Sequence, residues 1–351
     1  MSFITKPRVQ NARLPINDLG LNVRDYEGGM STLCAGCGHD SITGAIVQAA
    51  FELNVEPHRM AKLSGIGCSS KTPAYFMRQS HGFNSVHGRM PSVATGANSV
   101  NGEIYYVGVS GDGDSLSIGL GQFCHAIRRN LNILYMIENN GVYGLTKGQF
   151  SASADKGSKA KKGEANMQPP IDPALTAITM GASFVARSFS GDKEQLVPLI
   201  KAALSHKGFA MIDVISPCVT FNDHEGSTKS YKFTREHYHP AIHTDFVPPS
   251  AEIRAEYAAG KAMPVTLHDG SQIILRKVDE AFDPTDKVRA WSYLEQQRNA
   301  GEIVTGLLYL DESQQEMHEI NQLPDEPLNS VEFDRLCPGS ETLGKLQERF
   351  R

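Results

Sequence analysis

The sequence predicts an α/β protein with an open, mostly parallel sheet and helices on both faces. Apolar runs of strand length alternate with segments of helical periodicity from about residue 40 to Pro217, and such alternation is typical of a parallel sheet covered by helices. The totals agree, because 351 residues, 40% hydrophobic and 21% charged, suffice for one large domain with a buried core.

The predicted elements follow one another in a regular order. A helix is expected after Asp40, since apolar residues recur at helical spacing from Ile42 to Ala50. The later elements are, in order, the strand AKLSGIG ending at Cys68, the strand IYYVGVS, a helix after the GDG turn, the strand NILYMI, the helix DPALTAITMG, the strand ASFVARSF, the helix KEQLVPLIKAALSH and the strand FAMIDVIS. The strand, helix and strand that begin at Ile104 form a βαβ unit.

Three regions are expected along the chain. Residues 1–30, with prolines and a glycine pair, have the composition of an N-terminal arm. Residues 31–230 hold the alternating elements and form the main domain. Residues 231–351 contain a weaker strand, SQIILRKV, with runs of acids and prolines, so we expect a C-terminal extension that packs on the core or on a partner subunit.

Charge and composition exclude several classes of partner. The formal net charge is -5 and no long Lys/Arg run occurs, which argues against nucleic acid or an anionic membrane as the main partner. No stretch approaches the roughly 18 apolar residues of a membrane span, and MSFITKPRVQ lacks a signal-peptide apolar region. A cytoplasmic protein is expected, and in a reducing compartment its cysteines are not expected to form disulfides.

Acidic and amide side chains follow two consecutive predicted strands. Asp112 lies in GDGDSLSIGLG after IYYVGVS, and Asn139–Asn140 follow NILYMI. Parallel strands deliver their carboxyl ends to one edge of the sheet, where Asp112 and Asn140 can converge. Gly-Asp-Gly alone is a frequent turn and Asn pairs are common in loops. Together they predict a Mg²⁺ site of oxygen ligands that a diphosphate completes.

This arrangement, with G-V-Y after the Asn pair, resembles the thiamine diphosphate motif of thiamine-dependent enzymes. The resemblance implies Asp112, the Asn140 side chain and the Val142 carbonyl as Mg²⁺ ligands. The expected cofactor-binding residues are Gly65, Gly67, Cys68, Ser69, His87, Gly111, Asp112, Gly113, Asp114, Asn140, Val142, Tyr143, Gly144 and Leu145. Glycines such as Gly65 and Gly67 permit close backbone approach to the cofactor, although a simple turn uses them too.

The cysteines leave alternatives open. CAGC, from Cys34 to Cys37, fits a redox pair, half of a zinc site or half of an iron–sulfur site. A second close pair, usual in zinc knuckles, is missing from the sequence. Cys68 and Cys218 lie at predicted strand ends and can approach the diphosphate edge, where four thiolates would hold a [4Fe-4S] cluster. A cluster-free thiamine enzyme and a non-catalytic, zinc-stabilised subunit are the rival interpretations.

Several motifs together resemble the β subunit of 2-oxoacid:ferredoxin oxidoreductases: CAGCGH, GIGCSS, HGRMPSVATGAN, GDG with NN, YGLTKGQ and the late Pro-Cys. The likeness covers roughly residues 25 to 245. It implies Cys34, Cys37, Cys68 and Cys218 as cluster ligands, coenzyme A as co-substrate and ferredoxin as electron acceptor. It also implies an α subunit that supplies the activating glutamate, in an αβ pair that is doubled to (αβ)2.

The segment TKGQ is similar to family members that act on 2-oxoglutarate rather than on pyruvate. Leu145 and Lys147 follow the Asn pair, and a lysine there, or Lys71, can meet the distal carboxylate of 2-oxoglutarate. His87 is a further candidate for contact with thiamine or substrate. The expected activity is therefore oxidative decarboxylation of 2-oxoglutarate to succinyl-CoA and CO₂, reversible to carboxylation, with pyruvate or branched-chain oxo acids as alternative substrates.

Overall fold

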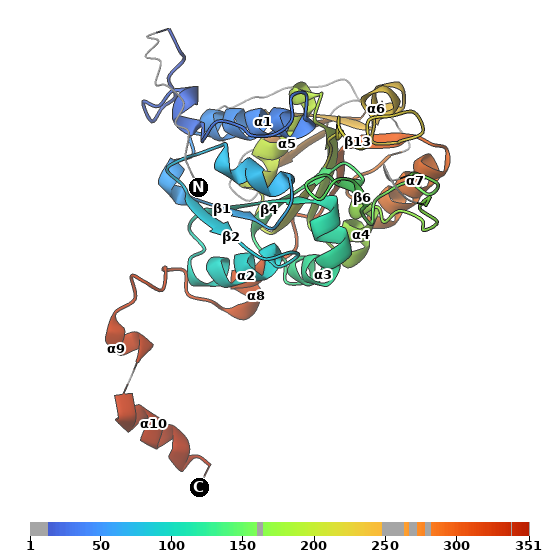
Figure 1. Ribbon diagram of the computed structural model, residues 1–351. Coiled ribbons are helices and arrows are strands. Elements are labelled where there is room, and N and C mark those ends of the chain that lie inside the picture. The colour runs from blue at the N-terminus through green and yellow to red at the C-terminus, as the bar shows by residue number, and fades with distance from the viewer. Residues whose placement is uncertain are drawn as a thin grey trace.

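The structure, a computed structural model, describes residues 13–159, 164–247, 263–266, 272–277, 282–337 and 339–350. An eight-stranded sheet lies at its centre (Figure 1). Residues 1–12 of the predicted N-terminal arm lie outside the described part, as do segments of the predicted extension. Within the described ranges, no helix combines the length and apolar character needed to cross a membrane.

Helices and strands alternate along the chain as the sequence predicts. The helices and helical turns are η1 (Val23–Tyr26), α1 (Gly38–Glu52), η2 (Pro57–Arg59), η3 (Ser69–Ala74), α2 (Met90–Val100), η4 (Gly113–Ile118), α3 (Leu120–Arg128), α4 (Pro173–Met180), α5 (Lys193–Ser205), α6 (Tyr231–Glu236), α7 (Lys287–Asn299), α8 (Met317–Asn321), α9 (Phe333–Leu336) and α10 (Gly339–Glu348). The strands are β1 (Met60–Ser64), β2 (His81–Asn84), β3 (Tyr105–Gly111), β4 (Ile133–Asn139), β5 (Val142–Tyr143), β6 (Gln149–Phe150), β7 (Phe184–Phe189), β8 (Phe209–Ile215), β9 (Tyr238–Pro240), β10 (Ile242–Val247), β11 (Met263–Thr266), β12 (Gln272–Lys277) and β13 (Ile303–Leu310).

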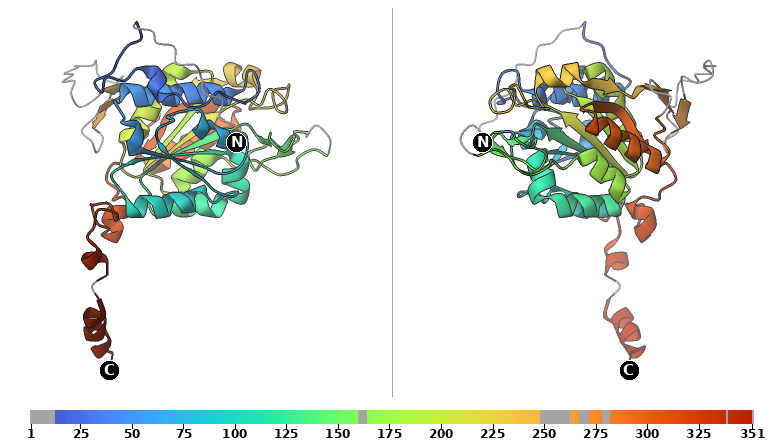
Figure 2. Two further views of the ribbon diagram at one scale, coloured as in Figure 1. Left: turned by 60° about the vertical axis from the view of Figure 1, so that its left-hand side comes forward. Right: turned by 90° about the vertical axis from the view of Figure 1, so that its right-hand side faces the viewer.

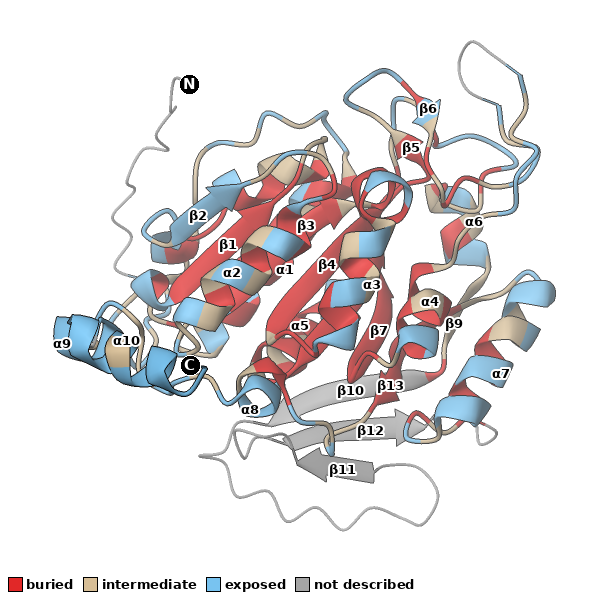
Figure 3. Ribbon diagram, turned by 90° about the horizontal axis from the view of Figure 1, so that it is seen from below, coloured by how far each residue is buried: buried red, intermediate tan, exposed pale blue. Residues whose placement is uncertain are grey.

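The central sheet confirms the predicted fold class. Its strand order is β2-β1-β3-β4-β8-β7-β13-β9, and the neighbouring strands are parallel except for the β13–β7 pair. Helices α1 and α5 cover one face, while α2, α3 and α4 cover the other (Figure 3). Because both faces are covered, β4 and β8 are buried along their whole length and consist mainly of apolar residues.

Two element boundaries differ from the predicted ones. The strand expected to end at Cys68 ends at Ser64, because the chain turns away at Gly67, whose φ of +137° is unfavourable for other residues. The helix expected after the GDG turn begins as a π-helical segment, η4, before α3 starts at Leu120. Both differences place additional loop backbone at the carboxyl edge of the sheet.

The chain after residue 230 returns to the core. Helix α7 packs beside α4, and β13 pairs antiparallel with β7. The sequence analysis did not anticipate this strand. Strands β10, β12 and β11 form a separate antiparallel sheet. Helices α9 and α10 extend away from the body and bury no residues (Figure 2).

Candidate functional site

The predicted ligands follow parallel strands that end at one edge of the sheet. Gly111 at the end of β3 pairs with Glu138 of β4, and Asn139 at the end of β4 pairs with Ile215 of β8. This register aligns the strand ends. The loops that follow β1, β3, β4 and β8 carry Cys68, Asp112, Asn140 and Cys218.

Asp112 is buried at the start of η4 and is held by donors from the segments after β4. Its Oδ2 accepts hydrogen bonds from the Gly141 N–H at 3.0 Å and from the Ser153 hydroxyl at 2.6 Å. The Ser151 hydroxyl donates to the same oxygen. The Asn140 N–H donates to Oδ1 over a longer distance, 3.4 Å. The carboxylate is therefore oriented by the protein through Oδ2, and Oδ1 is its less engaged oxygen.

Asn140 is buried beside Asp112, as the sequence predicts. Its side-chain Oδ1 accepts a hydrogen bond from the Val142 N–H at 3.1 Å, and its carbonyl accepts one from Asn222 at 2.8 Å. Gly141, with a φ of +75°, turns the chain between Asn140 and Val142. The structure thus brings together the oxygen donors that could hold Mg²⁺, while their role as ligands stays a prediction.

Glycine is needed in this loop because other side chains pack against it. A Cβ on Gly113 would lie 2.5 Å from the ring of Tyr143, whose hydroxyl donates to the Gly113 carbonyl at 2.9 Å. A Cβ on Gly111 would lie 2.9 Å from the hydroxyl of Ser69. The two glycines therefore allow Ser69 and Tyr143 to pack directly against the backbone of the loop.

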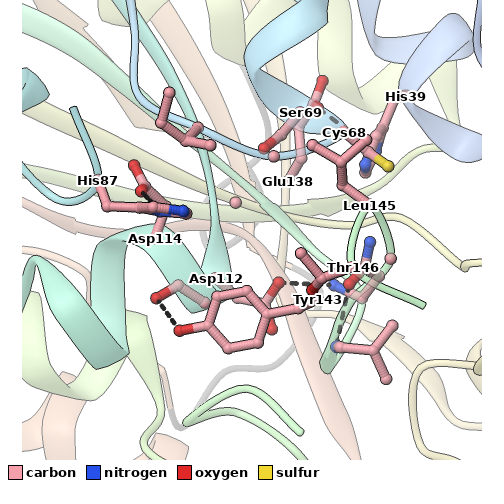
Figure 4. A pocket seen from close by; sticks show the side chains of 17 residues that line it. His39, Cys68, Ser69, His87, Asp112, Asp114, Glu138, Tyr143, Leu145 and Thr146 are labelled. Atoms are coloured by element: carbon pink, nitrogen blue, oxygen red, sulfur yellow. Dashed lines mark hydrogen bonds and ion pairs between the residues drawn. The ribbon is translucent and has the colours of Figure 1, made fainter. Parts of the chain in front are cut away.

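Both carboxylate oxygens of Asp114, the second aspartate of the motif, are hydrogen-bonded to other groups of the protein. Its Oδ1 lies 2.8 Å from His87 Nδ1 and accepts the Gly88 N–H at 2.9 Å, and its Oδ2 accepts the Ser110 hydroxyl at 2.9 Å. A Cβ on Gly65 would overlap this carboxylate. Asp114 therefore orients the ring of His87, which lines the pocket beside it (Figure 4).

Four of the six cysteines, Cys34, Cys37, Cys68 and Cys218, gather at the same edge of the sheet. The part of this edge around Asp112 and Asn140 is called the diphosphate end, and the part around these cysteines is called the cysteine end. A Cβ on Gly144 would lie 3.5 Å from Cys68 Sγ and 3.6 Å from Cys218 Sγ, so these two thiols flank one glycine. Cys37 is half-buried, and Cys34, linked to it by a turn, is exposed. Cys124 lies on α3, and Cys337 lies just beyond α9 in the projecting tail.

Burial and nearby acidic groups favour the neutral form of two of these thiols, Cys37 and Cys68. Burial raises the pKa of Cys37 to about 12, and the nearby Glu138 and Cys218 add to the effect. Burial also raises the pKa of Cys68, with a contribution from Cys218 and a smaller one from Cys34, while Lys71 opposes them. Metal ligation needs thiolates, so binding a metal here would release protons.

A buried acid and a buried histidine lie between the two ends. Glu138 is fully buried, and burial raises its pKa well above the usual range. It accepts hydrogen bonds from the Thr72 hydroxyl at 3.0 and 3.1 Å, and its Oε2 lies 3.4 Å from His39 Nδ1. Burial lowers the pKa of His39 to about 4, and its Nδ1 lies 2.6 Å from the Ser216 hydroxyl. Glu138 was not predicted from the sequence to lie at this site, although an acid inside an apolar strand was a visible signal.

One pocket joins both ends (Figure 4). Its lining residues are His39, Ile66, Gly67, Cys68, Ser69, His87, Gly111, Asp112, Gly113, Asp114, Glu138, Asn140, Val142, Tyr143, Gly144, Leu145 and Thr146. Leu145 thus lies where the sequence placed it. Lys147 and Lys71 are not among these residues; Lys147 is exposed, with a φ of +78°, and Lys71 lies close enough to Cys68 to influence its thiol.

Residues 65–214 match the family described as "Thiamine pyrophosphate enzyme, C-terminal TPP binding domain". The chain is 43% identical over 191 residues to the 2-oxoacid:ferredoxin oxidoreductase subunit beta of Saccharolobus solfataricus, covering 54% of this chain and 63% of that subunit. It is 37% identical over 189 residues to 2-oxoglutarate synthase subunit KorB of Methanocaldococcus jannaschii, covering 54% and 69%. The match thus spans less than two thirds of the S. solfataricus subunit.

A solved structure is similar over more of the chain. It is the 2-oxoglutarate:ferredoxin oxidoreductase from Magnetococcus marinus with 2-oxoglutarate, coenzyme A and succinyl-CoA bound. The TM-score is 0.70 at 30% sequence identity, and the likeness covers 88% of this chain and 90% of that chain. The similarity therefore includes elements beyond residue 214, among them part of the C-terminal region.

Proposed function

The chain belongs to the β subunits of 2-oxoacid:ferredoxin oxidoreductases, and from this premise we propose that it carries the diphosphate and cluster sites of a 2-oxoglutarate:ferredoxin oxidoreductase. The reaction converts 2-oxoglutarate and coenzyme A into succinyl-CoA and CO₂, and the released electron pair passes one electron at a time to ferredoxin. The observation that carries the proposal is the meeting of Asp112 and Asn140 with four cysteines along one pocketed edge of a parallel sheet.

The diphosphate end fits a magnesium-held thiamine diphosphate. Asp112 offers an oriented carboxylate, the Asn140 amide oxygen lies beside it, and Val142 adds its carbonyl to the oxygen-only set that Mg²⁺ prefers. When bound, thiamine diphosphate supplies the nucleophile and the electron sink for decarboxylation. The chain's own residues would position it: Ser69 and Tyr143 pack against Gly111 and Gly113, and the Tyr143 hydroxyl holds the loop by donating to the Gly113 carbonyl.

The cysteine end fits a [4Fe-4S] cluster held by Cys34, Cys37, Cys68 and Cys218. Two of the thiols, Cys68 and Cys218, flank Gly144, and Cys34 and Cys37 are joined by a turn. The sequence lacks the second close cysteine pair that is usual in zinc knuckles, which supports a cluster over one tetrahedral zinc. The resulting centre would adjoin the thiamine pocket through Cys68.

We assign the main substrate contacts to the loop after Asn140. Leu145 and Thr146 line the pocket, and Lys147 follows them, so its ammonium can reach the rim where a distal carboxylate would lie. His87, oriented by Asp114, contributes a polar group to the opposite wall. Lys71 is the second candidate cation. Pyruvate and branched-chain oxo acids have no second carboxylate, so the lysine gives them no charge-assisted hydrogen bond.

Turnover requires partners. The α subunit completes the pocket and supplies the activating glutamate, in an αβ unit that is doubled to (αβ)2, and ferredoxin takes the electrons. A cytoplasmic location and the direction of carbon flow stay predictions. The β-subunit naming of the relatives supports an α partner, and the coenzyme A in the M. marinus structure supports coenzyme A as co-substrate.

The test is an anaerobic assay of the assembled αβ complex with 2-oxoglutarate, pyruvate and branched-chain oxo acids. We expect coenzyme A-dependent reduction of ferredoxin to be fastest with 2-oxoglutarate. Lys147→Met should raise KM for 2-oxoglutarate about 10-fold or more and leave pyruvate use unchanged, since a charged hydrogen bond contributes about 1.5–3 kcal/mol. Lys156→Met, an exposed lysine of the next loop, is the matched control. Equal losses with both substrates would contradict the assignment of Lys147.

A further inference from the structure

A threonine hydroxyl contacts one of the four clustered cysteines. Thr220 Oγ1 donates a hydrogen bond to Cys34 Sγ at 3.7 Å. The two residues lie on different loops, one after β8 and one before α1. A thiolate bound to iron carries no proton, so in the loaded site the hydroxyl can only be the donor.

The protein itself fixes the position of Thr220. The N–H groups of Phe221 and Asn222 both donate to the Cys218 carbonyl, at 3.2 and 2.9 Å, and form a tight turn that carries Thr220. The facing loop is held as well, because the Tyr231 hydroxyl donates to the Gly36 carbonyl at 3.0 Å. The turn that supplies the ligand Cys218 thus also supplies a donor to the ligand Cys34.

Cys34 is the exposed member of the four, whereas Cys37, Cys68 and Cys218 are half-buried. In the isolated chain, Cys34 is therefore the most solvent-accessible of these four thiols. Hydrogen bonds to the ligating sulfurs and solvent exposure are the main protein influences on the potential of an iron–sulfur centre.

We propose that the Thr220 hydroxyl raises the reduction potential of the centre held by Cys34, Cys37, Cys68 and Cys218. The inference rests on the cluster assigned under Proposed function. Reduction adds one electron and no proton to the cluster, and the added negative charge spreads onto the thiolate sulfurs. A hydroxyl dipole directed at Cys34 Sγ stabilises that charge, so it favours the reduced form.

The experiment compares Thr220→Val and Thr220→Ser in the anaerobically assembled αβ complex. Iron and sulfide content are measured first, and the midpoint potential follows from a redox titration monitored by electron paramagnetic resonance. Valine removes the hydroxyl and keeps the shape, so we expect a more negative midpoint. Serine keeps the donor and should retain the wild-type potential. Thr95→Val, on α2, is a control that should change nothing.

The outcomes separate this inference from the cluster assignment. Full iron content with an unchanged midpoint in Thr220→Val would overturn the role of Thr220 alone. If valine disturbs iron loading, Thr220→Ala removes the hydroxyl without the branched side chain and gives the same test. A wild-type complex without iron or sulfide would overturn the cluster itself and this inference with it.

Discussion

The diphosphate end and the cysteine end share one edge of the sheet but are built differently. At the diphosphate end, backbone and serine donors already surround the buried carboxylate of Asp112. At the cysteine end, Cys34 is exposed and burial raises the pKa of Cys37 to about 12. The fold alone orients the Asp112 carboxylate, whereas burial disfavours the thiolate forms of Cys37 and Cys68. In the proposed cluster site, metal–sulfur bonds would supply the free energy that deprotonation of these thiols costs.

The largest effect expected from this contrast is at Cys218. Cys218→Ser should abolish [4Fe-4S] content, because the proposed cluster would lose one of its four thiolate ligands. Thiamine diphosphate affinity should change little. Iron and sulfide analysis with calorimetric titration of thiamine diphosphate measures both, and Cys124→Ser on α3 is the matched control. Retention of all iron in Cys218→Ser would contradict the assignment of Cys218 as a cluster ligand.

The reciprocal change is at Asp112. Asp112→Ala should weaken thiamine diphosphate binding in the presence of Mg²⁺ at least about 100-fold, since even the groups behind metal ligands contribute 10–100-fold. The iron content should persist, because no cysteine contacts this carboxylate among its described hydrogen bonds. Asp325→Ala, an exposed aspartate near the C-terminus, serves as control. Simultaneous loss of cofactor and iron would show that the two ends are not separable.

Protonation of His39, which lies between the two ends, should make the whole fold acid-sensitive. Burial lowers the pKa of His39 from 6.5 to about 4, so between these values only the unfolded chain takes up the proton. Neutral His39 contributes its full stabilisation of the fold at pH values above 6.5, the pKa of the residue in the unfolded chain. As the pH falls from 7 to 4, about 3 kcal/mol of unfolding free energy is lost. Urea unfolding across this range measures the slope. His39→Gln should flatten it; parallel curves for the two proteins would contradict the assignment.

The smallest predicted effect concerns the donors behind Asp112. Ser153→Ala removes one hydrogen bond to a carboxylate that keeps its Gly141 and Ser151 partners. We expect thiamine diphosphate affinity to fall about 10-fold, corresponding to about 1.5 kcal/mol. The same calorimetric titration applies, with Ser330→Ala, on the exposed surface, as control. A loss as large as that of Asp112→Ala would mean that the fold orients this end less firmly than its contacts indicate.

Local patterns in the sequence were sufficient for most of the fold and for the proximity of Asp112 and Asn140. The burial of β4 and β8 follows from their apolar runs, and the position of Asp112 follows from glycines at a strand end. The serines were not predictable, because Ser151 and Ser153 reach Asp112 from 39 and 41 residues away through a loop without periodicity. The contacts of Glu138 were not predictable for another reason: its partners Thr72 and His39 come from η3 and α1, which are distant from it in the sequence.

Strand β13 was not predicted because its partner is distant in the sequence and runs in the opposite direction. Its position has a consequence for how the protein is made. During synthesis β7 emerges from the ribosome long before Ile303–Leu310 exist, so the nascent sheet exposes one unpaired flank of peptide groups for much of translation. A fragment cut to residues 65–214 would keep that exposed flank permanently. We expect such a fragment to self-associate, whereas chains that include β13 remain dispersed.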